Sequence, residues 1–243
     1  MTQLWSHITH QLRISFRDPA YVFTTLVLPA GLYWFFAVPE SNSPYIATYL
    51  IGSFSAFSFF GVIFLQYSIN RSQEKTSPWA RYLSTLPIPY WMIIASRLVT
   101  SVILGSLACL LIYGVGHSFT PTDLNFLVFL KMISFLTLGG LPFLLMGLVV
   151  GEIFSPKAVV PVANFFHLVL SFAGGLWKPP EILPEALQKI TPWLPTYHYG
   201  LLTWSLSSPE IQVKSSNILY LIYFGCAMGL VLLIMKRTNV LKN

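Results

Sequence analysis

Residues 126–150 read FLVFLKMISFLTLGGLPFLLMGLVV, and Lys131 is the one charged side chain among them. A helix rises about 1.5 Å per residue, so this stretch is long enough to cross the roughly 30 Å hydrocarbon core of a bilayer. Apolar side chains cover every side of such a helix, which suits lipid or the interior of a bundle better than water. We therefore predict that residues 126–150 form a transmembrane helix.

Five further apolar runs of similar length flank this one. They cover residues 21–38, 46–66, 91–115, 158–177 and 218–235. The chain of 243 residues is 55% hydrophobic and 9% charged, whereas a soluble domain averages about 25% charged residues. Little chain is left for a separate catalytic module. The sequence predicts an all-α membrane protein in which residues 1–243 form a single domain of six transmembrane helices.

The basic residues divide unevenly between the two sides of these runs. Ten of the fourteen lie on the side that holds both termini: Arg13, Arg17, Arg71, Lys75, Arg81, Arg97, Lys157, Lys236, Arg237 and Lys242. Because positive charge marks cytoplasmic loops, we expect both termini in the cytoplasm and the chain in the bacterial cytoplasmic (inner) membrane. The net charge of +6 then describes orientation, and we expect no nucleic acid partner.

Several single residues inside the runs carry further expectations. Arg97 and Lys131 lie a turn or two inside their runs, and we expect both side chains to extend toward the headgroups. A mid-span Asp or Glu is missing from the six runs, which disfavours an ion-coupled secondary transporter. Pro29 and Pro142 should each kink a helix. Small residues four apart could pack helices within the chain or between subunits; they are Gly147 and Gly151, Gly225 and Gly229, and Ser101, Gly105 and Cys109.

The N-terminal residues 1–19 have the pattern of an amphipathic helix. At 100° per residue one face collects Leu4, Trp5, Ile8, Leu12 and Phe16, and the other collects Gln3, His7, His10, Gln11, Arg13 and Arg17. Such a helix should lie in the cytoplasmic interface with its apolar face toward lipid. Asp18-Pro19 should end it and turn the chain into the first span.

Residues 76–87 predict a second short helix, between the second and third spans. Ser77 is a suitable N-cap and Pro78 suits the first helical position. Trp79, Tyr82, Leu83 and Leu86 then follow at i, i+3, i+4 and i+7, and Pro87 ends the run. With two to three turns it cannot span a bilayer, so its apolar face must bind headgroups or a partner protein.

Residues 178–217, between the fifth and sixth spans, form the longest segment on the outer side. Repeated prolines divide it into short pieces, and tryptophan and tyrosine side chains suited to the headgroup region flank or fill it; these are Trp177, Trp193, Tyr197, Tyr199 and Trp204. We expect short helices that enter the outer leaflet and return, packed against the bundle.

Taken together, these motifs resemble the type-2 ATP-binding-cassette (ABC) exporter permeases, the six-span membrane subunits of bacterial drug and antibiotic exporters. Members have an Arg-Asp-Pro-like entry to the first span, seen here as Arg17-Asp18-Pro19. They have a Glu-x-Gly-Thr-like element, then Leu-Leu and proline, after the second span; here Glu74-Lys-Thr-Ser77, Tyr82-Leu83 and Pro87 stand there, with Thr76 in place of the glycine. After the fifth span the family's glycine, proline and Leu-Pro pattern matches Gly174–Pro179, Leu183-Pro184, Pro192, Pro195 and Tyr197.

The resemblance implies that residues 76–87 are a coupling helix that docks on a separate ABC ATPase subunit. The residues it assigns to this coupling are Glu74, Thr76, Ser77, Pro78, Trp79, Tyr82, Leu83 and Leu86. It also implies that ATP and Mg bind the partner ATPase, with no cofactor on this chain, and that a second permease completes a homodimer or heterodimer. Binding of the short helix to headgroups alone is the alternative.

A second set of residues is a candidate for the transport pathway or its outer gate: Ser55, Ser58, Asn164, His167, Trp177, Pro184 and Tyr197. Asn164 and His167 lie three apart and could instead serve an intramembrane enzyme, but a packing histidine is the simpler interpretation. The sequence contains no P-loop and no hydrolase or metal motif, so we expect a transport subunit and not an enzyme.

The nature of the spans also bears on the substrate. Apolar and aromatic spans without a mid-membrane charge suit an amphipathic or hydrophobic compound, such as a drug or antibiotic, which ATP hydrolysis would drive outward. An exporter of polysaccharide or lipid-linked glycan from the same superfamily is the alternative.

Overall fold

A computed structural model describes residues 2–78, 90–207 and 211–237 of the chain. Over these residues the protein is helical, with no β-strand. Of the predicted coupling helix at residues 76–87, only residues 76–78 fall in the described part. Its apolar residues Trp79, Tyr82, Leu83 and Leu86 lie outside the described residues.

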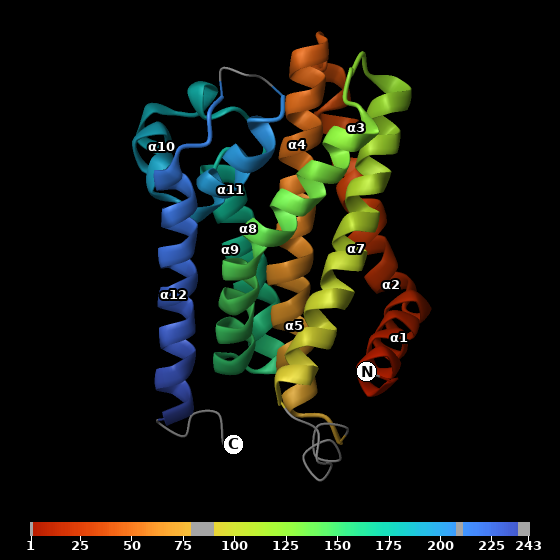
Figure 1. The fold of residues 1–243 in the computed structure, drawn as a ribbon, viewed down its shortest axis with the longest axis vertical. Helices are drawn as coiled ribbons and strands as arrows, with labels where there is room; N and C mark the ends of the chain where they lie inside the picture. The colour runs from red at the N-terminus through yellow and green to blue at the C-terminus, as the bar shows by residue number, and fades with distance from the viewer. Residues whose placement is uncertain (1, 79–89, 208–210, 238–243) are drawn as a thin grey trace.

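Within the described residues, six helical spans are long and apolar enough to cross a membrane, as the sequence predicts. The first runs through α2 (Pro19–Val22), a π-helical turn at Phe23–Val27 and α3 (Leu28–Phe36); the second through α4 (Pro44–Phe60), a π-helical turn at Gly61–Gln66 and α5 (Tyr67–Lys75). The others are α7 (Tyr90–Phe119), α8 (Phe126–Ile153), α9 (Pro156–Ala173) and α12 (Ser215–Arg237). Figure 1 shows them as one upright bundle.

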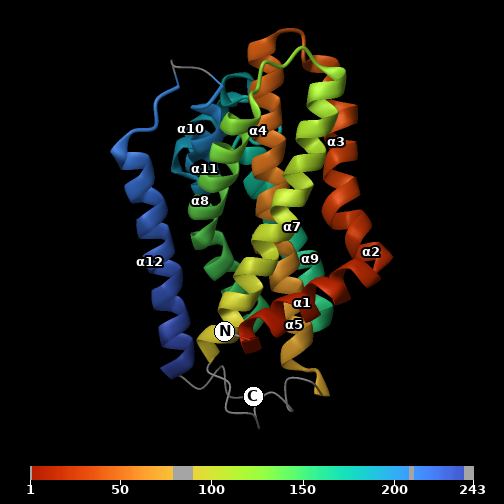
Figure 2. The same cartoon turned by 45° about the vertical axis from the view of Figure 1, so that its right-hand side comes forward.

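The second span is the centre of this bundle. In its most apolar part 89% of the residues are buried, against 22% for α9 and 11% for α12. Its aromatic side chains fill the core, and Phe54, Phe59, Phe60 and Phe64 are all fully buried. The span is therefore surrounded by protein, whereas α12 lies at the periphery in Figures 1 and 2.

The two prolines that were expected to kink helices, Pro29 and Pro142, behave differently. Near Pro29 the helix widens one turn earlier, over Phe23–Val27, where the Leu28 N–H donates to the Phe23 carbonyl. The wider turn agrees with the presence of Pro29, because its ring has no N–H to donate and its bulk disturbs the α-helical hydrogen bonds of the preceding turn. α8, in contrast, continues through Pro142 as one α-helix from Phe126 to Ile153.

Glycines let α8 approach the second span closely. A Cβ at Gly147 would lie 3.0 Å from the Phe64 carbonyl oxygen, and one at Gly151 would lie 2.8 Å from that of Ser68. These two small residues thus pack helices within the chain, one of the two alternatives open from the sequence. Gly229 on α12, in contrast, has no such neighbour within 4 Å.

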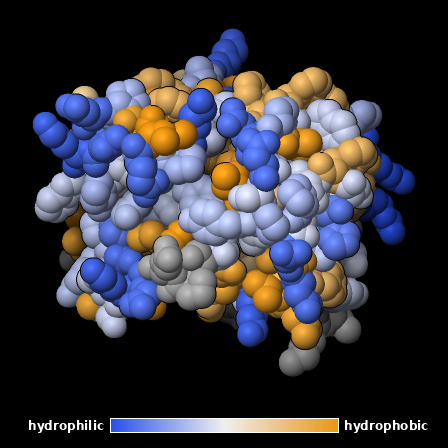
Figure 3. Space-filling view, turned by 90° about the horizontal axis from the view of Figure 1, so that it is seen from above, coloured by the Kyte–Doolittle hydropathy of each residue, from blue (hydrophilic) through white to orange (hydrophobic). Residues whose placement is uncertain are grey.

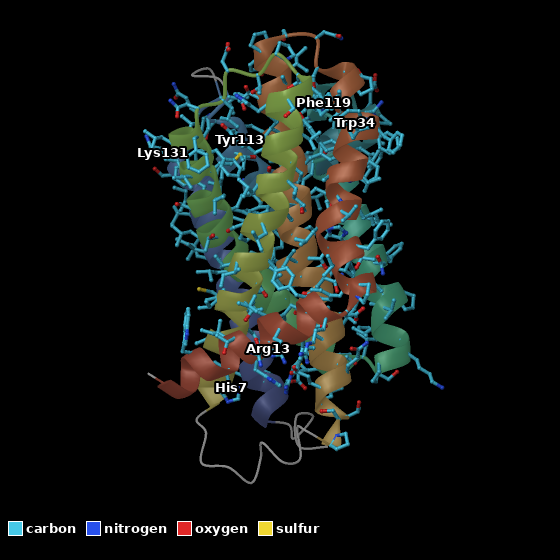
Figure 4. The ribbon with its side chains drawn as sticks, turned by 90° about the vertical axis from the view of Figure 1, so that its right-hand side faces the viewer. His7, Arg13, Trp34, Tyr113, Phe119 and Lys131 are labelled. Carbon is cyan, nitrogen blue, oxygen red and sulfur yellow. The ribbon has the colours of Figure 1, made fainter. Side chains whose placement is uncertain are left out.

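The N-terminal helix α1 (Thr2–Arg17) runs obliquely past the lower part of the bundle (Figures 2 and 4) and contacts α7. Ile8 is buried, while Trp5 and Phe16 on the same predicted face are exposed. Asp18 separates α1 from α2, and its carboxylate accepts hydrogen bonds from the backbone N–H groups of Ala20 and Tyr21. The predicted turn at Asp18-Pro19 is confirmed.

The segment between α9 and α12 consists of short helices at the opposite end of the bundle (Figure 1). They are a 3₁₀ turn at Pro180–Ile182, α10 (Glu185–Ile190), a second 3₁₀ turn at Thr191–Trp193, and α11 (Pro195–Trp204). α11 packs against α4, α8 and α12, and Tyr199 and Trp204 are buried. Seen from this end, polar and charged side chains cover much of the surface with apolar patches between them (Figure 3).

Candidate functional site

An ion pair and hydrogen bonds join the end of the second span to the end of the fourth. This end of the second span directly precedes residues 76–87 in the chain. Arg71 of α5 forms an ion pair with Glu152 of α8, whose side chain is only 6% exposed. The Lys75 Nζ donates to the carbonyl oxygens of Glu152 and Phe154 at 2.6 and 2.9 Å, and the Ser72 hydroxyl donates to that of Phe154 at 2.7 Å. Lys75 and Ser72 thereby satisfy carbonyls that the end of α8 leaves without helical partners.

α5 is fastened to α7 as well. Glu74 forms an ion pair with Arg97, whose side chain is 9% exposed. The expectation that Arg97 extends to the headgroups is therefore wrong, because its guanidinium is buried in the protein against a carboxylate. Lys131, for which the same was expected, is exposed and lies toward the other end of the bundle (Figure 4).

A polar cavity of about 550 Å³ lies beside this second ion pair, between α1, α5 and α7. Its lining includes His7, His10 and Gln11 of α1 together with Glu74 and Arg97. The Thr100 hydroxyl donates to Gln11 Oε1 at 3.0 Å, which ties α1 to α7. The polar face of α1 thus turns in part toward the bundle.

The described residues of the predicted coupling set follow α5 without a break. The Thr76 hydroxyl donates to the Gln73 carbonyl at 2.9 Å and the Ser77 hydroxyl to that of Glu74 at 2.8 Å. Pro78 is exposed. We name the set Arg71, Ser72, Glu74, Lys75, Arg97 and Glu152 the inner junction. Of its members, Glu74 alone was among the predicted site residues.

The predicted pathway residues fall into two places. Four of them, Ser58, Asn164, His167 and Trp177, line a small cavity of about 140 Å³ between the first, second and fifth spans. The His167 Nε2 donates to the Phe57 carbonyl at 3.2 Å and the ring contacts those of Phe57 and Phe60. Asn164 donates to the carbonyl of Val160, on its own helix. His167 is thus a buried, hydrogen-bonded histidine that packs against two phenylalanine rings and lines the small cavity.

Trp177, Pro184 and Tyr197 lie toward the opposite end from the inner junction, whereas Ser55 lies within the second span. Trp177 and Tyr197 line the outer cavity, a space of about 850 Å³ between α3, α4, α9 and the short helices. Ser55 is buried near Cys109, whose thiol donates to the Ser55 carbonyl. Pro184 precedes α10, and its carbonyl accepts from Leu187 and Gln188.

Aromatic and charged side chains form the walls and rim of the outer cavity. The aromatic ones are Phe36, Tyr45, Tyr49, Phe172, Trp177, Tyr197 and Trp204, and the charged ones are Glu40, Lys178, Glu181 and Lys214. Burial raises the pKa of the Tyr197 hydroxyl, and the nearby Glu181 carboxylate raises it further, so that phenol stays neutral. Tyr49 and Trp204 were not predicted as site residues, because contacts between distant parts of the chain place them here. For example, the Trp204 Nε1–H donates to the Ser53 hydroxyl at 2.7 Å, across 151 residues.

The described residues thus form a bundle of six apolar spans with a cavity at each end. The family model described as "ABC-2 family transporter protein" matches residues 19–235. The chain therefore belongs to the ABC-2 family of transporter proteins, as a multi-pass permease.

Among curated proteins, the chain is similar to "Putative transport permease YvfS" of Bacillus subtilis (strain 168). The two are 27% identical over 195 residues, which cover 78% of this chain and 79% of the relative. No solved structure matches the chain significantly. Family membership implies that the permease works with an ATPase subunit.

Proposed function

We propose that this chain is one of the two permeases of an ATP-driven exporter in the bacterial cytoplasmic membrane. In this proposal a separate ABC ATPase binds ATP and Mg and docks on residues 76–87, and the substrate leaves between two permeases toward the outer side. Both termini face the cytoplasm. Family membership and the position of the inner junction beside residues 76–87 support this assignment.

The inner junction would connect an ATPase bound at residues 76–87 to three of the membrane spans. α5 leads directly into residues 76–78, and its ion pairs reach α7 through Arg97 and α8 through Glu152. Glu152 and Arg97 are buried in these ion pairs, while Arg71 and Glu74 are partly exposed; separating either pair would leave a buried charge without its partner, which is unfavourable. A displacement of residues 76–87 would therefore move the second, third and fourth spans together rather than bend α5 alone.

The exposed apolar faces of the first and fifth spans offer a surface for the second permease. Trp34 and Phe35 on α3 and Phe165, Phe166 and Val169 on α9 are all exposed. The small cavity at His167 lies between these same spans. Lipid would cover whatever part of these faces the second permease leaves open.

The cavities favour an amphipathic or hydrophobic cargo such as a drug or antibiotic. Their walls are mainly apolar and aromatic. A long, heavily hydroxylated glycan would require many more polar groups along its route.

An efflux assay tests the ATP-driven mechanism. Cells would express the chain with an ABC ATPase from the same genome and be loaded with a panel of amphipathic fluorescent dyes. We expect efflux of at least one dye that stops on ATP depletion and when the P-loop lysine of the ATPase is replaced by alanine. Efflux that survives both treatments and follows an ion gradient would contradict the proposal and indicate a secondary transporter.

A further inference from the structure

Among the described residues, two spans contain a π-helical turn, and the two turns contact each other. They are Phe23–Val27 in the first span and Gly61–Gln66 in the second. Hydrogen bonds in a π-helix reach five residues along the chain instead of four, so each turn holds about one residue more than an α-helical turn. Such turns are rare and are frequently found at functional sites. The pair is therefore a candidate functional element.

Both turns line the small cavity between the first, second and fifth spans. Six of its lining residues belong to them: Thr24, Thr25, Gly61, Val62, Leu65 and Gln66. The cavity has a volume of about 140 Å³, which is smaller than the roughly 300–1,000 Å³ of typical ligand pockets. A change in the shape of either turn would change this volume.

Each turn has a hydroxyl group that bonds to carbonyl oxygens at its edge. The Thr24 hydroxyl donates to the carbonyls of Ala20 and Tyr21 at 2.8 and 3.2 Å. The Ser68 hydroxyl donates to the Phe64 carbonyl at 2.6 Å. In a membrane such side-chain bonds satisfy backbone groups that an irregular turn frees. The turns can therefore depart from the α-helical pattern without leaving these carbonyls unpaired.

The neighbouring helices accommodate the second turn closely. On α8, a Cβ at Gly147 would lie 3.0 Å from the Phe64 carbonyl oxygen. On the other side, a Cβ at Gly61 would lie 3.2 Å from the Nε2 of His167 on α9. The same Nε2 bonds to the Phe57 carbonyl at the end of α4. Glycine at both contacts thus makes space for the widened backbone between α8 and α9.

The second turn divides the central span into two parts with different attachments. In Figure 1, α5 lies below this turn and α4 above it. α5 belongs to the inner junction, whose ion pairs bind it to α7 and α8. α4 packs in the aromatic core and lines the outer cavity with Tyr49 and Leu50. Since helices bend where their α-helical hydrogen bonds are interrupted, the two parts can change direction relative to each other at Gly61–Gln66.

We propose that the two π-helical turns are a paired hinge. About them the inner parts of the first two spans, α2 and α5, turn relative to the outer parts, α3 and α4, and the small cavity widens. The hinge is a property of this chain alone, whereas its being driven by an ATPase rests on the proposed function.

Hydrogen exchange of the purified chain, without an ATPase, tests the hinge. The chain would be placed in nanodiscs, and deuterium uptake by the backbone N–H groups of the second span would be followed by mass spectrometry. Residues 61–67 should exchange about tenfold or more faster than residues 50–57 of α4, because the hydrogen bonds of a hinge open more often than those of a regular helix. Equal exchange in the two stretches would overturn the proposal.

Deletion of Leu65 assigns the fast exchange to the π-helical turn. It removes the extra residue of the turn, so an α-helical turn should form and α5 should keep its direction. Exchange over residues 61–67 should then fall to the rate of α4. Leu65→Ala is the matched control, because it removes the side chain but keeps the residue count, and it should retain the fast exchange. Fast exchange in both variants would contradict the assignment. If the deletion variant does not fold, the wild-type comparison with α4 decides alone.

Cysteine accessibility in the complex with an ABC ATPase tests whether the small cavity widens. The reactive positions would be Asn164→Cys, which lines the cavity, and the control Leu138→Cys on the exposed surface of α8. With both native cysteines replaced by serine, the Asn164→Cys chain should react with a methanethiosulfonate at rates that differ severalfold between the ATP-bound and nucleotide-free states. Leu138→Cys should react at one rate, and deletion of Leu65 should abolish the difference at position 164. An unchanged rate for Asn164→Cys would overturn the widening. Hydrogen exchange needs no ATPase, so its result stands whether or not ATP-driven efflux is found.

Discussion

At the scale of single residues, the inner junction depends on charged side chains whose partners come from distant parts of the chain. Arg71 finds Glu152 from 81 residues away, and Arg97 binds Glu74 across residues 76–87. Removing one member of such a pair leaves the other buried without a counter-charge, which costs more than the pair contributes.

Glu152→Gln should therefore lower the free energy of unfolding by about 2–4 kcal/mol, because the amide cannot neutralise Arg71. Denaturation of the purified chain by SDS, followed by circular dichroism, measures this. The charge reversals Arg71→Glu and Glu152→Arg should each destabilise, and the double reversal should recover part of the loss. Equal stability of wild type and Glu152→Gln would show that the ion pair contributes nothing.

His198 should make stability depend on pH. Burial lowers the pKa of its imidazole from 6.5, although the hydrogen bond from Nε2 to the Pro192 carbonyl opposes this. A histidine with a lowered folded-state pKa takes up its proton more readily when unfolded, so stability is full above about pH 7 and falls as the pH drops through 6.5.

The comparison of wild type with His198→Gln isolates this titration from those of the other histidines. Between pH 7.5 and 5 the wild type should lose more stability in SDS denaturation than the variant does. Parallel pH profiles for the two proteins would show that His198 does not titrate differently on folding.

At the scale of helices, the close contact between α8 and the second span needs glycine. A Cβ at position 151 would meet the Ser68 carbonyl oxygen and the Arg71 Cβ, both at 2.8 Å. Backbone atoms cannot move aside as a flexible side chain can, so the two helices would have to separate. That separation would also strain the Arg71–Glu152 ion pair.

Gly151→Ala should lower the free energy of unfolding by about 1–3 kcal/mol, the usual cost of overpacking. Gly229→Ala on α12 is the matched control, since nothing lies within 4 Å of its added Cβ, and its stability should be unchanged or slightly raised. Both would be measured in the same SDS titration. A Gly151→Ala protein as stable as the control would mean that α8 shifts without cost.

The helices themselves could largely be predicted from hydropathy, because apolar runs of this length have few alternatives. All six predicted runs are helical spans. Some helix ends differ from the predicted ones, because backbone geometry sets them. The fifth run was predicted to reach residue 177, but α9 ends at Ala173. Gly175, with a φ of +83°, turns the chain there. The π-helical turns at Phe23–Val27 and Gly61–Gln66 have no signature in the apolar pattern.

The candidate sites were predictable only where a residue stands out locally. Trp177 and Tyr197 were expected at the outer headgroup level as amphipathic aromatic residues, and at the outer gate from the family resemblance; both line the outer cavity. Glu152, Ser72 and Tyr49 were not expected, since their roles arise from contacts between distant helices. The assignment of Trp79, Tyr82, Leu83 and Leu86 to ATPase coupling stays a prediction.

At the scale of the whole molecule, the inner junction and the outer cavity lie at opposite ends of the central second span. α5 reaches the end where α1 begins and α12 finishes, and α4 begins at the end formed by α10 and α11 (Figures 1 and 2). A side-chain contact between the first and third spans, Trp34 against Phe119 with centroids 4.1 Å apart, braces the upper end (Figure 4). In the proposed mechanism, the second span connects residues 76–87 to the outer cavity.

The most direct test of this account is whether an ABC ATPase binds residues 76–87. The chain would be co-expressed with each ABC ATPase subunit of the same genome and purified through a tag on the permease, and the amount of ATPase retained would be measured. Wild type should retain the ATPase, as should the control Trp193→Ala, whose side chain is exposed at the opposite end. The double variant Trp79→Ala, Leu83→Ala should lose about tenfold or more of it, because buried aromatic and aliphatic anchors carry most of the binding free energy at interfaces. Absence of the ATPase from the wild-type preparation, or full retention by the double variant, would contradict the account.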